Sequence, residues 1–388
     1  MVAVIAAVVV GCTNPAPEPT TPTTPTTPTT PTTPTTPTTP TTPVSNEPFA
    51  GVGLEPDGTP YLFDDSTNGL IWPWTVTASG IINALFTKAG AEVVNEDANL
   101  DVQKQIGTIE DLILKHRDGL MLHGADPEAL VPVVERLVES GVPVFNYDEK
   151  VNTDVVTTYV TVSQESMGEA VGQWYLDYAD QTGQNLVVYE LRGQLGSPTA
   201  EGRHRGLHNV VDGSSVVTVI ESPDTNWVVQ SAMNFVSDAL VAHPEINVIF
   251  DPGSLIPGVI EAMRTADRLV PMGEDGHIVF TTIGAEKSAI DSLREGYIDA
   301  IGTQSPWEDA HGVSVAAMRN VCCGLDVPKE ILIQSYMLDM TNIDNGRWGA
   351  VKAWGDMQDV PFDQWPVLEF PAEYGIPNPT VADKLAGY

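Results

Sequence analysis

The sequence is poor in basic residues, and this shortage limits the partners that the protein can have. Only 18 Lys and Arg stand against 52 Asp and Glu, which gives the 388-residue chain a net charge of −34. Such an excess of negative charge repels the phosphates of nucleic acids and the headgroups of anionic lipids. We therefore expect no nucleic-acid partner.

Cysteine is also scarce, with three residues in the whole chain. Cys322 and Cys323 are neighbours in the sequence, and a disulfide between adjacent cysteines is strained at best. We expect two thiols packed at the end of a helix. The cysteine pattern predicts neither a disulfide framework nor a metal site.

The sequence lacks the common motifs of catalysis. It has no Gly-x-Ser-x-Gly elbow, no His-Glu-x-x-His pair and no phosphate-binding Walker loop, and Gly51-Val52-Gly53 lacks the third glycine of a dinucleotide fingerprint. Its seven histidines are scattered, and none forms a recognisable pair with a Cys or Ser nucleophile. We expect a protein that is not an enzyme and that needs no cofactor.

The apolar run at the N-terminus, residues 2–11, is too short for a membrane span, which needs about 20 apolar residues. It fits the core of a signal peptide, although no Lys or Arg precedes it, so the true start lies upstream or the signal is atypical. The run ends in Val9-Val10-Gly11-Cys12, which resembles the lipobox at which bacterial lipoprotein precursors are cleaved. This resemblance implies that residues 1–12 form a lipoprotein signal and that Cys12 is lipidated.

A proline-rich segment follows the signal. From Thr20 to Pro43 the chain repeats Thr-Thr-Pro without interruption, so no core can form there. Proline at every third position favours a polyproline II helix, which would reach roughly 75 Å at about 3.1 Å per residue. We interpret residues 13–47 as a stalk that holds the folded part away from a membrane.

Beyond the stalk, helical and strand patterns alternate. In the region 101–150 two amphipathic helices alternate with two short apolar strands, and the polar residues His123 and Asp148 follow the strands directly. Asp126 is placed to cap the second of these helices, with Pro127 at its first position. Ligands bind beyond the carboxyl ends of strands in parallel sheets, so His123 and Asp148 occupy candidate positions. The alternatives are that Asp148 only caps a turn and that His123 is an ordinary loop histidine.

The same alternation continues to the end of the folded part. We expect strands at about 60–63, 91–94, 120–122, 142–147, 157–162, 185–191, 216–220, 247–250, 278–282, 298–302 and 331–337. We expect the remaining helices at about 76–88, 165–180, from 198 onward, 229–242, 255–266, 287–295 and 308–323. This order predicts an α/β protein with two doubly wound parallel-sheet lobes in succession.

Two further loops carry candidate binding residues. Asn68, Trp72 and Trp74 follow the first strand, and two indoles beside an amide suit a sugar ring, whose faces are apolar and whose edges are polar. The alternative is that both tryptophans fill the core. Arg203 and Arg205 lie in the first turns of a helix capped by Ser197, where arginine can give paired hydrogen bonds to ligand oxygens.

Several segments together resemble a known family. They are Gln103-Lys104-Gln105-Ile106, Asp118-Gly119-Leu120, Gly141 to Val144 before Asp148, Arg203 ahead of Gly206, Ala242 to Asn247, and Thr303-Gln304-Ser305-Pro306. With them, residues 60–340 resemble the type I periplasmic binding proteins, and within these the ribose-binding group that serves ABC sugar importers. The resemblance implies two lobes joined by a three-crossing hinge.

The resemblance also implies an organisation and a set of partners. The N-terminal lobe would comprise 48–163 plus 305–332, and the C-terminal lobe and tail 164–304 plus 333–388. The protein would be a monomer that binds a small sugar or polyol and delivers it to the membrane permease of an ABC transporter. It would be held by its lipid anchor alone on the outer face of the cytoplasmic membrane.

The resemblance assigns ligand contacts residue by residue. Trp74 and Trp227 match the aromatic residues of the two lobes, and Asp148, Arg203 and Gln304 match the polar contacts. At four places the chain departs from the pattern. Glu149, Glu165 and Gly253 replace an Arg and two Asn residues, and the segment 281–284 lacks an expected Asp. The complete set of expected ligand-binding residues is Asn68, Trp72, Trp74, His123, Asp148, Glu149, Glu165, Arg203, Trp227, Asp251 and Gln304.

These departures make ribose itself a poor candidate. They favour another pentose, a polyol or a cyclitol, and an amine-bearing ligand if Glu149 and Glu165 both face the cleft. One alternative function stays open, which is a sensory binding protein that presents its ligand to a chemoreceptor or a histidine kinase.

Overall fold

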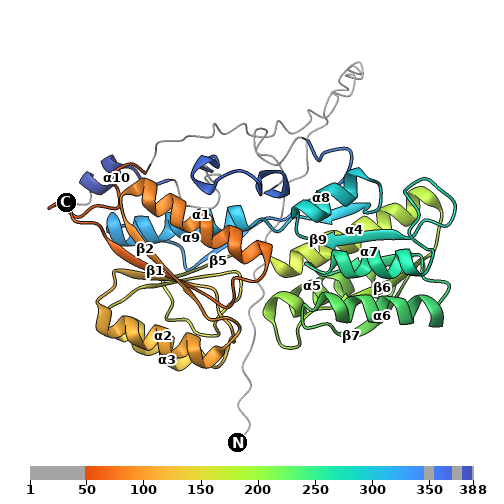
Figure 1. Cartoon of the computed structure of the whole chain (residues 1–388), viewed down its shortest axis with the longest axis horizontal. Coiled ribbons are helices and arrows are strands. Elements are labelled where there is room, and N and C mark those ends of the chain that lie inside the picture. Colours follow the sequence, from red (N-terminus) through yellow and green to blue (C-terminus); the bar gives the residue numbers. More distant parts are fainter. Residues whose placement is uncertain (1–48, 345–353, 369–377, 387–388) are drawn as a thin grey trace, which may run out of the picture. The chain divides into compact units, whose positions relative to one another are not determined.

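The computed structural model describes residues 49–344, 354–368 and 378–386. The expected signal, the lipobox with Cys12 and the stalk lie outside these residues. The described part contains two six-stranded sheets, each with helices on both faces (Figure 1).

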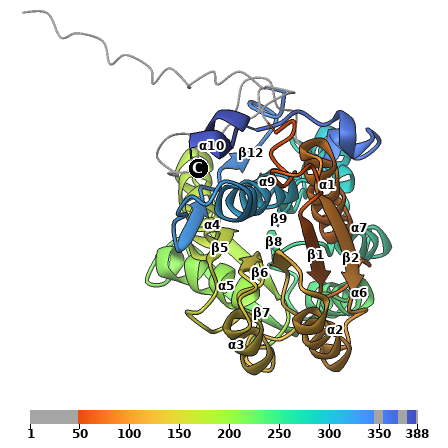
Figure 2. The same cartoon turned by 90° about the vertical axis from the view of Figure 1, so that its left-hand side faces the viewer.

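The first sheet is entirely parallel and has the strand order β11-β5-β4-β3-β1-β2. Helices α1 and α9 cover one face, and α2 and α3 cover the other (Figure 2). The strands are β1 (Leu62–Thr67), β2 (Glu92–Asp97), β3 (Gly119–Leu122), β4 (Val144–Tyr147), β5 (Thr158–Val162) and β11 (Glu330–Ile333). The helices are α1 (Pro73–Ala89), α2 (Val102–Lys115), α3 (Val131–Glu139) and α9 (Pro306–Ala317).

The second sheet repeats this order as β12-β10-β9-β8-β6-β7, and all its pairs are parallel except β10 with β12. The strands are β6 (Leu186–Arg192), β7 (Val217–Asp224), β8 (Val248–Asp251), β9 (Val279–Ile283), β10 (Ala300–Gly302) and β12 (Met337–Leu338). The helices are α4 (Gln164–Thr182), α5 (Pro198–Val211), α6 (Val229–Ala242), α7 (Ile256–Thr265) and α8 (Lys287–Arg294).

The chain crosses between the sheets three times, from β5 to α4, from β10 to α9 and from β11 to β12. The last two crossings are hydrogen-bonded to each other, because the Thr303 oxygen accepts from Ser335 Oγ at 2.9 Å and Thr303 N donates to the Tyr336 oxygen at 2.9 Å. The expected single strand at 331–337 is therefore two strands in different sheets. The predicted α/β fold with two doubly wound lobes and a three-crossing hinge is confirmed.

The region 101–150 folds largely as its pattern predicts. The Asp101 side chain caps α2, and Ile109 and Leu112 are buried beneath it. Helix α3, however, begins later than expected. Asp126 accepts from the backbone N–H groups of Glu128 and Ala129 and so caps a turn that precedes the helix.

Strand β1 runs further than its apolar residues suggested, because its buried polar residues have partners. Asp64 Oδ2 lies 2.8 Å from Arg117 Nε. Asp65 accepts hydrogen bonds from Ser79 and, at 2.9 Å, from the Tyr147 hydroxyl. The strand thus ends next to Asn68, and α1 starts at Pro73, which brings Trp74 into its first turn.

The C-terminal segment contacts elements of both lobes, although it was expected with the second. It contains η2 (Trp354–Met357), η3 (Phe362–Gln364) and α10 (Val381–Ala386). Gly355 N donates to the Ala285 oxygen at 2.8 Å, and Trp307 Nε1 donates to the Pro366 oxygen at 3.1 Å. A side chain at Gly80 of α1 would collide with the ring of Phe362.

The two cysteines of the described part lie next to each other at the end of a helix. Cys322 ends the π-helix η1 (Met318–Cys322), and it and Cys323 are buried free thiols, as predicted.

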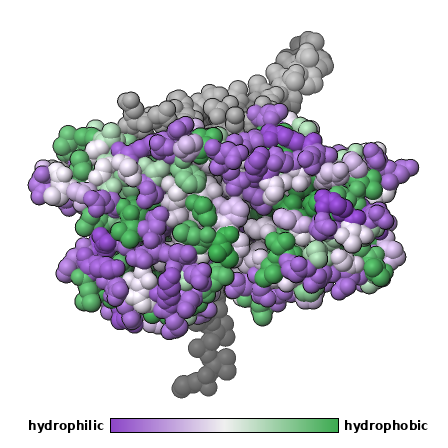
Figure 3. Space-filling model, in the orientation of Figure 1, coloured by the Kyte–Doolittle hydropathy of each residue, from purple (hydrophilic) through white to green (hydrophobic). Residues whose placement is uncertain are grey.

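Among the described residues, no helix has the length and apolar character needed to cross a membrane. Hydrophilic residues cover most of the face in Figure 3, with hydrophobic residues between them.

Candidate ligand-binding site

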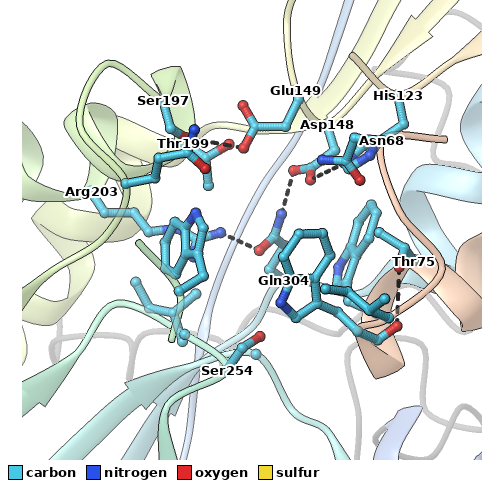
Figure 4. Close-up of a pocket in the computed structure, with 18 of the residues that line it drawn as sticks. Asn68, Thr75, His123, Asp148, Glu149, Ser197, Thr199, Arg203, Ser254 and Gln304 are labelled. Carbon is cyan, nitrogen blue, oxygen red and sulfur yellow. Dashed lines mark hydrogen bonds and ion pairs between the residues drawn. The ribbon is translucent and has the colours of Figure 1, made fainter. Parts of the chain in front are cut away.

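A cavity of about 600 Å³ is lined by loops at the carboxyl ends of strands from both sheets. The first lobe contributes the loops after β1, β3 and β4, and the second lobe contributes those after β6, β7, β8 and β9. A cavity of this size matches the usual pocket for a small ligand, about 300–1,000 Å³. Figure 4 shows ten labelled residues around it.

Asp148 is the most connected carboxylate of the first-lobe wall. It is buried after β4, and its Oδ2 lies 2.9 Å from His123 Nε2. Its Oδ1 accepts from Gln304 Nε2 at 2.6 Å and from Gln164 Nε2 at 3.4 Å. These three partners fix the carboxylate at the cavity surface, and Figure 4 shows two of them, His123 and Gln304.

Arg203 is the corresponding group of the second-lobe wall. Ser197 caps α5 with Pro198 in its first turn, as predicted, and this start places the Arg203 side chain at the cavity. Its Nε donates to Gln164 Oε1 at 2.8 Å, and its Nη2 donates to Gln304 Oε1. Burial lowers the pKa of Arg203 to about 10, so the guanidinium remains charged at neutral pH.

Two glutamines of the hinge therefore join the two walls. Gln164 lies at the first crossing and Gln304 at the second, and each donates to Asp148 while accepting from Arg203. An amide is suited to this position because it offers a donor and an acceptor at once. The hinge thus connects the principal anion of one lobe to the principal cation of the other.

Aromatic rings line both walls. Trp74 stacks on His123 with ring centroids 5.6 Å apart, and Thr75 Oγ1 holds its loop by donating to the Gly69 oxygen at 2.7 Å. On the opposite wall the ring of Trp227 lies 6.0 Å from the Arg203 guanidinium. A side chain at Gly193 would come within 2.7 Å of the Trp227 ring, so only glycine leaves room for the indole there.

Three cavity residues other than glycine adopt left-handed backbone conformations. They are Asp148, Trp227 and Ser254, with φ of 52°, 58° and 62°. Such conformations cost on the order of 1–3 kcal/mol each and concentrate at ligand sites, where surrounding contacts hold them. For a residue as bulky as Trp227 the conformation is a genuine outlier.

Several buried polar atoms of the cavity residues have no hydrogen-bond partner within the described ranges. They include Asn68 Oδ1, Trp74 Nε1, His123 Nδ1 and Trp354 Nε1. Buried polar groups are rarely left unpaired. Both donors and acceptors are among these atoms, and each of them is enclosed by protein atoms in this structure.

Two further carboxylates give the cavity an unusual charge. Glu149 accepts from Ser197 Oγ of the other lobe at 3.0 Å, and burial followed by the charge of Asp148 raises its pKa to about 7. Glu286 lies at the N-terminus of α8, but its side chain accepts no hydrogen bond from the backbone N–H groups of that helix. Burial raises the pKa of Glu286 to about 8. Both carboxyl groups therefore hold a proton over part of the neutral range.

The structure brings nine of the eleven expected residues to the cavity, which are Asn68, Trp72, Trp74, His123, Asp148, Glu149, Arg203, Trp227 and Gln304. It does not bring Glu165 or Asp251 there. Glu165 is on the outside of α4, where it pairs with Arg205 at 2.8 Å and leaves that arginine outside the cavity as well. Asp251 is fully buried and accepts from Gly253 N and Thr282 Oγ1, so it shapes the loop instead of lining the cavity.

Sequence reasoning missed several residues of the site. The cavity lining also includes Ser197, Thr199, Ser254, Glu286 and Trp354, and Gln164 contacts both Asp148 and Arg203. Ser197 was expected only as a helix cap. A signal existed for Glu286, because it lies just beyond the segment that lacks the expected aspartate. Trp354 carried no signal, since it comes from the tail, far from the other loops in the sequence.

Comparisons with known proteins agree with this geometry. A family model described as "Periplasmic binding protein domain" matches residues 72–325. The ribose import binding protein of Bacillus subtilis is 27% identical over 236 residues, covering 60% of this chain and 73% of the relative. Both the family and this relative are described as binding proteins, not as enzymes.

Solved structures share the fold. An ABC transporter solute-binding protein from Mycobacterium smegmatis with bound glycerol superposes with a TM-score of 0.65 at 22% identity, covering 73% of this chain and 95% of that chain. A galactofuranose-binding protein gives a TM-score of 0.66 at 17% identity, covering 79% and 98% of the two chains. At these identities the likeness shows the architecture alone.

Proposed function

The chain belongs to the periplasmic binding protein family, and we propose that it captures a small sugar or polyol between its two lobes and delivers it to the permease of an ABC transporter. The observation that carries the proposal is the hinge connection, in which Gln164 and Gln304 each bridge Asp148 and Arg203. A ligand bound to both residues contributes contacts from both lobes. Closing the lobes around the ligand therefore increases its binding energy.

The chemistry of the cavity supports a neutral, hydroxylated ligand. Trp74 and Trp227 offer apolar faces for a ring, while Asp148 and Arg203 offer an acceptor and a set of donors for its hydroxyl groups. Glu149 and Glu286 add carboxyl groups, and Arg203 is the one guanidinium among the lining residues. This balance disfavours an anionic sugar.

The departures from the ribose pattern favour a different hydroxyl arrangement. Glu149 lines the cavity, and Gly253 brings no side chain to it where the family pattern has an Asn. We propose a pentose other than ribose, a polyol or a cyclitol as the ligand. An amine-bearing sugar is the second candidate, favoured by the carboxyl groups of Glu149 and Glu286.

The sequence supports a location for this activity. The lipobox ending in Cys12 and the Thr-Thr-Pro stalk fit a monomer tethered by lipid to the outer face of the cytoplasmic membrane. A sensory role with a chemoreceptor or a histidine kinase uses the same closure of the lobes. Neighbouring genes for a permease and an ATPase would favour transport over sensing.

A ligand screen tests the proposal. The full chain is melted in the presence of pentoses, hexoses, polyols, inositols, amino sugars and sugar acids. A compound that binds only the folded state raises the melting temperature, because at a concentration of 100 times Kd it adds about 2.7 kcal/mol to the free energy of unfolding. We expect at least one neutral compound to raise it. A response to sugar acids alone would contradict the assigned ligand class, and no response at all would contradict the sugar-binding function.

A further inference from the structure

A second cluster of polar residues lies outside the cavity, between β6 and α5. Glu190 belongs to the strand, and His204 and His208 are four residues apart on one face of the helix. One ligand atom from each of the three residues lies within 4.8 Å of the others. None of the three lines the sugar cavity.

The distances within the cluster are close to those of a coordination site. His204 Nδ1 lies 3.0 and 3.1 Å from the two carboxylate oxygens of Glu190, and His208 Nε2 lies 3.1 Å from Oε2. A tetrahedral zinc ion with bonds of about 2.0–2.2 Å holds its ligand atoms roughly 3.3–3.6 Å apart. Each of these three contacts would open by a few tenths of an ångström around such an ion.

The burial of the cluster is graded in a way that suits an ion. Glu190 is 1% exposed, and a carboxylate at such a position requires a cationic partner. The side chains of His204 and His208 are 23% and 21% exposed. The imidazole side is thus open to solvent, which provides an entry path and room for a water ligand.

An outer carboxylate orients one of the imidazoles. His208 Nδ1 lies 2.8 Å from Oδ1 of Asp212, the residue that follows the end of α5. Metal-binding histidines usually donate their second ring N–H to such an acceptor, which leaves the other nitrogen free for the metal. Here that other nitrogen, Nε2, is the atom that faces Glu190.

The nearest cation of the same strand is already paired. Arg192 lies two residues beyond Glu190, and its guanidinium binds Glu201 at 3.3 Å and Glu221 at 2.7 Å. Arg192 therefore pairs with other carboxylates, and the Glu190 carboxylate contacts the two histidines instead. A purely ionic cluster, with protonated imidazoles and no metal, is the alternative.

We propose that Glu190, His204 and His208 bind a divalent transition metal ion such as Zn²⁺, with water as a fourth ligand. Imidazole and carboxylate ligands suit zinc, cobalt and nickel, whereas calcium and magnesium prefer sets made of oxygen alone. The ion ties β6 to α5, the helix that carries Arg203 into the sugar cavity. The site is separate from that cavity, so the proposal does not rest on the sugar-binding function.

The test is a metal titration of the full chain after chelation and removal of any affinity tag. Zn²⁺ is titrated by calorimetry, Co²⁺ by its visible absorption, and Mg²⁺ serves as the hard-cation comparison. We expect one Zn²⁺ per chain, a higher melting temperature with Zn²⁺ than without, and no response to Mg²⁺. No Zn²⁺ binding, or equal responses to Zn²⁺ and Mg²⁺, would overturn the proposal.

Variants identify the ligands. The double variant His204→Ala/His208→Ala is expected to weaken Zn²⁺ binding by more than about 100-fold, and Asp212→Ala by about 10–100-fold as an outer carboxylate. His243→Ala is the matched control, because His243 contacts Glu245 at 3.2 Å in an exposed pair on the same lobe. The control should bind Zn²⁺ as the wild type does.

The isosteric Glu190→Gln provides a second loss variant if the double variant fails to fold. We expect it to weaken Zn²⁺ binding and to reduce the absorption of bound Co²⁺. Unchanged Zn²⁺ affinity in a folded Glu190→Gln or histidine variant would show that the ion binds elsewhere and would contradict the assignment.

Discussion

The two lobes place a carboxylate after equivalent strands, but they surround it differently. Asp148 follows β4 and Glu286 follows β9, and these strands hold the same position in the two sheet orders. Asp148 has His123, Gln164 and Gln304 as partners. No described side chain donates a hydrogen bond to Glu286, and burial raises its pKa to about 8.

This difference shows how one topology supplies two kinds of ligand contact. The first-lobe carboxylate is held in place before any ligand arrives, which favours a strong charge-assisted hydrogen bond to a hydroxyl group. The second-lobe carboxyl group can be protonated and can then donate as well as accept. The two walls therefore make unequal contributions to affinity, and the following variants measure this inequality in order of expected effect.

The largest effect is expected from Asp148→Ala. Removing the carboxylate leaves the ligand hydroxyl groups and the two hinge glutamines without their acceptor, so affinity should fall about 100-fold, or roughly 3 kcal/mol. Calorimetry with the compound found by screening measures the loss. Glu165→Ala, which removes a carboxylate from the outside of α4, should keep wild-type affinity. Equal affinities in wild type and Asp148→Ala would place the ligand elsewhere.

Trp227→Ala tests the aromatic contact of the second lobe. Loss of ring stacking should weaken binding by about 10-fold, since aromatic contacts contribute about 0.5–1.5 kcal/mol beyond the area they bury. Intrinsic fluorescence of the wild type should change on ligand addition, and a flat signal would argue against tryptophan in the site.

Gly253→Ala tests the space beside Arg203. The residue has a φ of 133°, and an added Cβ would lie 3.0 Å from Arg203 Nη1. We expect affinity to fall about 5-fold, roughly 1 kcal/mol, because the guanidinium must move. Gly213→Ala is the control, with a φ of 83° and open space around the added carbon. It should lose stability without losing affinity, and an equal loss of affinity in both would refute the steric explanation.

The last variant, Glu286→Gln, is measured by the pH dependence of stability instead of by affinity. The pKa of Glu286 is raised from 4.5 to about 8 in the folded state, so the folded state binds more protons than the unfolded state between these values. Stability of the unliganded protein therefore falls as pH rises through this range. Melting temperatures from pH 5 to 8 should decline less steeply in Glu286→Gln than in the wild type.

Glu165→Gln is the control for this pH series. The hydrogen bonds from Arg205 and Asn209 lower the pKa of Glu165, so this group does not titrate between pH 5 and 8. Its variant should show the wild-type slope. If Glu286→Gln also shows the wild-type slope, the carboxyl group of Glu286 is charged throughout and the contrast between the two walls disappears.

The sequence allowed the fold and the first-lobe wall to be predicted more fully than the second-lobe wall. Hydrophobic periodicity located the strands, and the residues directly after them, such as His123 and Asp148, were placed correctly in the cavity. The prediction that Glu165 lines the cavity was wrong by one position in the sequence. In the first turn of α4 the side chains of Gln164 and Glu165 point about 100° apart, and the former, not the latter, faces Asp148.

Long-range packing explains the remaining errors. The polar residues of β1 read as a loop, yet Arg117, Ser79 and Tyr147 pair with its aspartates and keep them in a strand. Trp354 reaches the cavity because Gly355 docks on the Ala285 oxygen, a contact that no local pattern encodes. Glu190 and His204 meet across a strand and a helix, so their spacing in the sequence gave no metal motif.

Closure of the lobes around the ligand is tested most directly by a distance measurement between the lobes. Spin labels are attached through Leu114→Cys on α2 and Val241→Cys on α6, whose native side chains are 79% and 83% exposed. Both helices follow the edge strands farthest from the hinge, β2 and β7, where closure moves the lobes most. Cys12 is replaced by Ser, while Cys322 and Cys323 are buried. Saturating ligand should shift the distances to a shorter and narrower distribution, and a distribution that ligand leaves unchanged would contradict capture by closure.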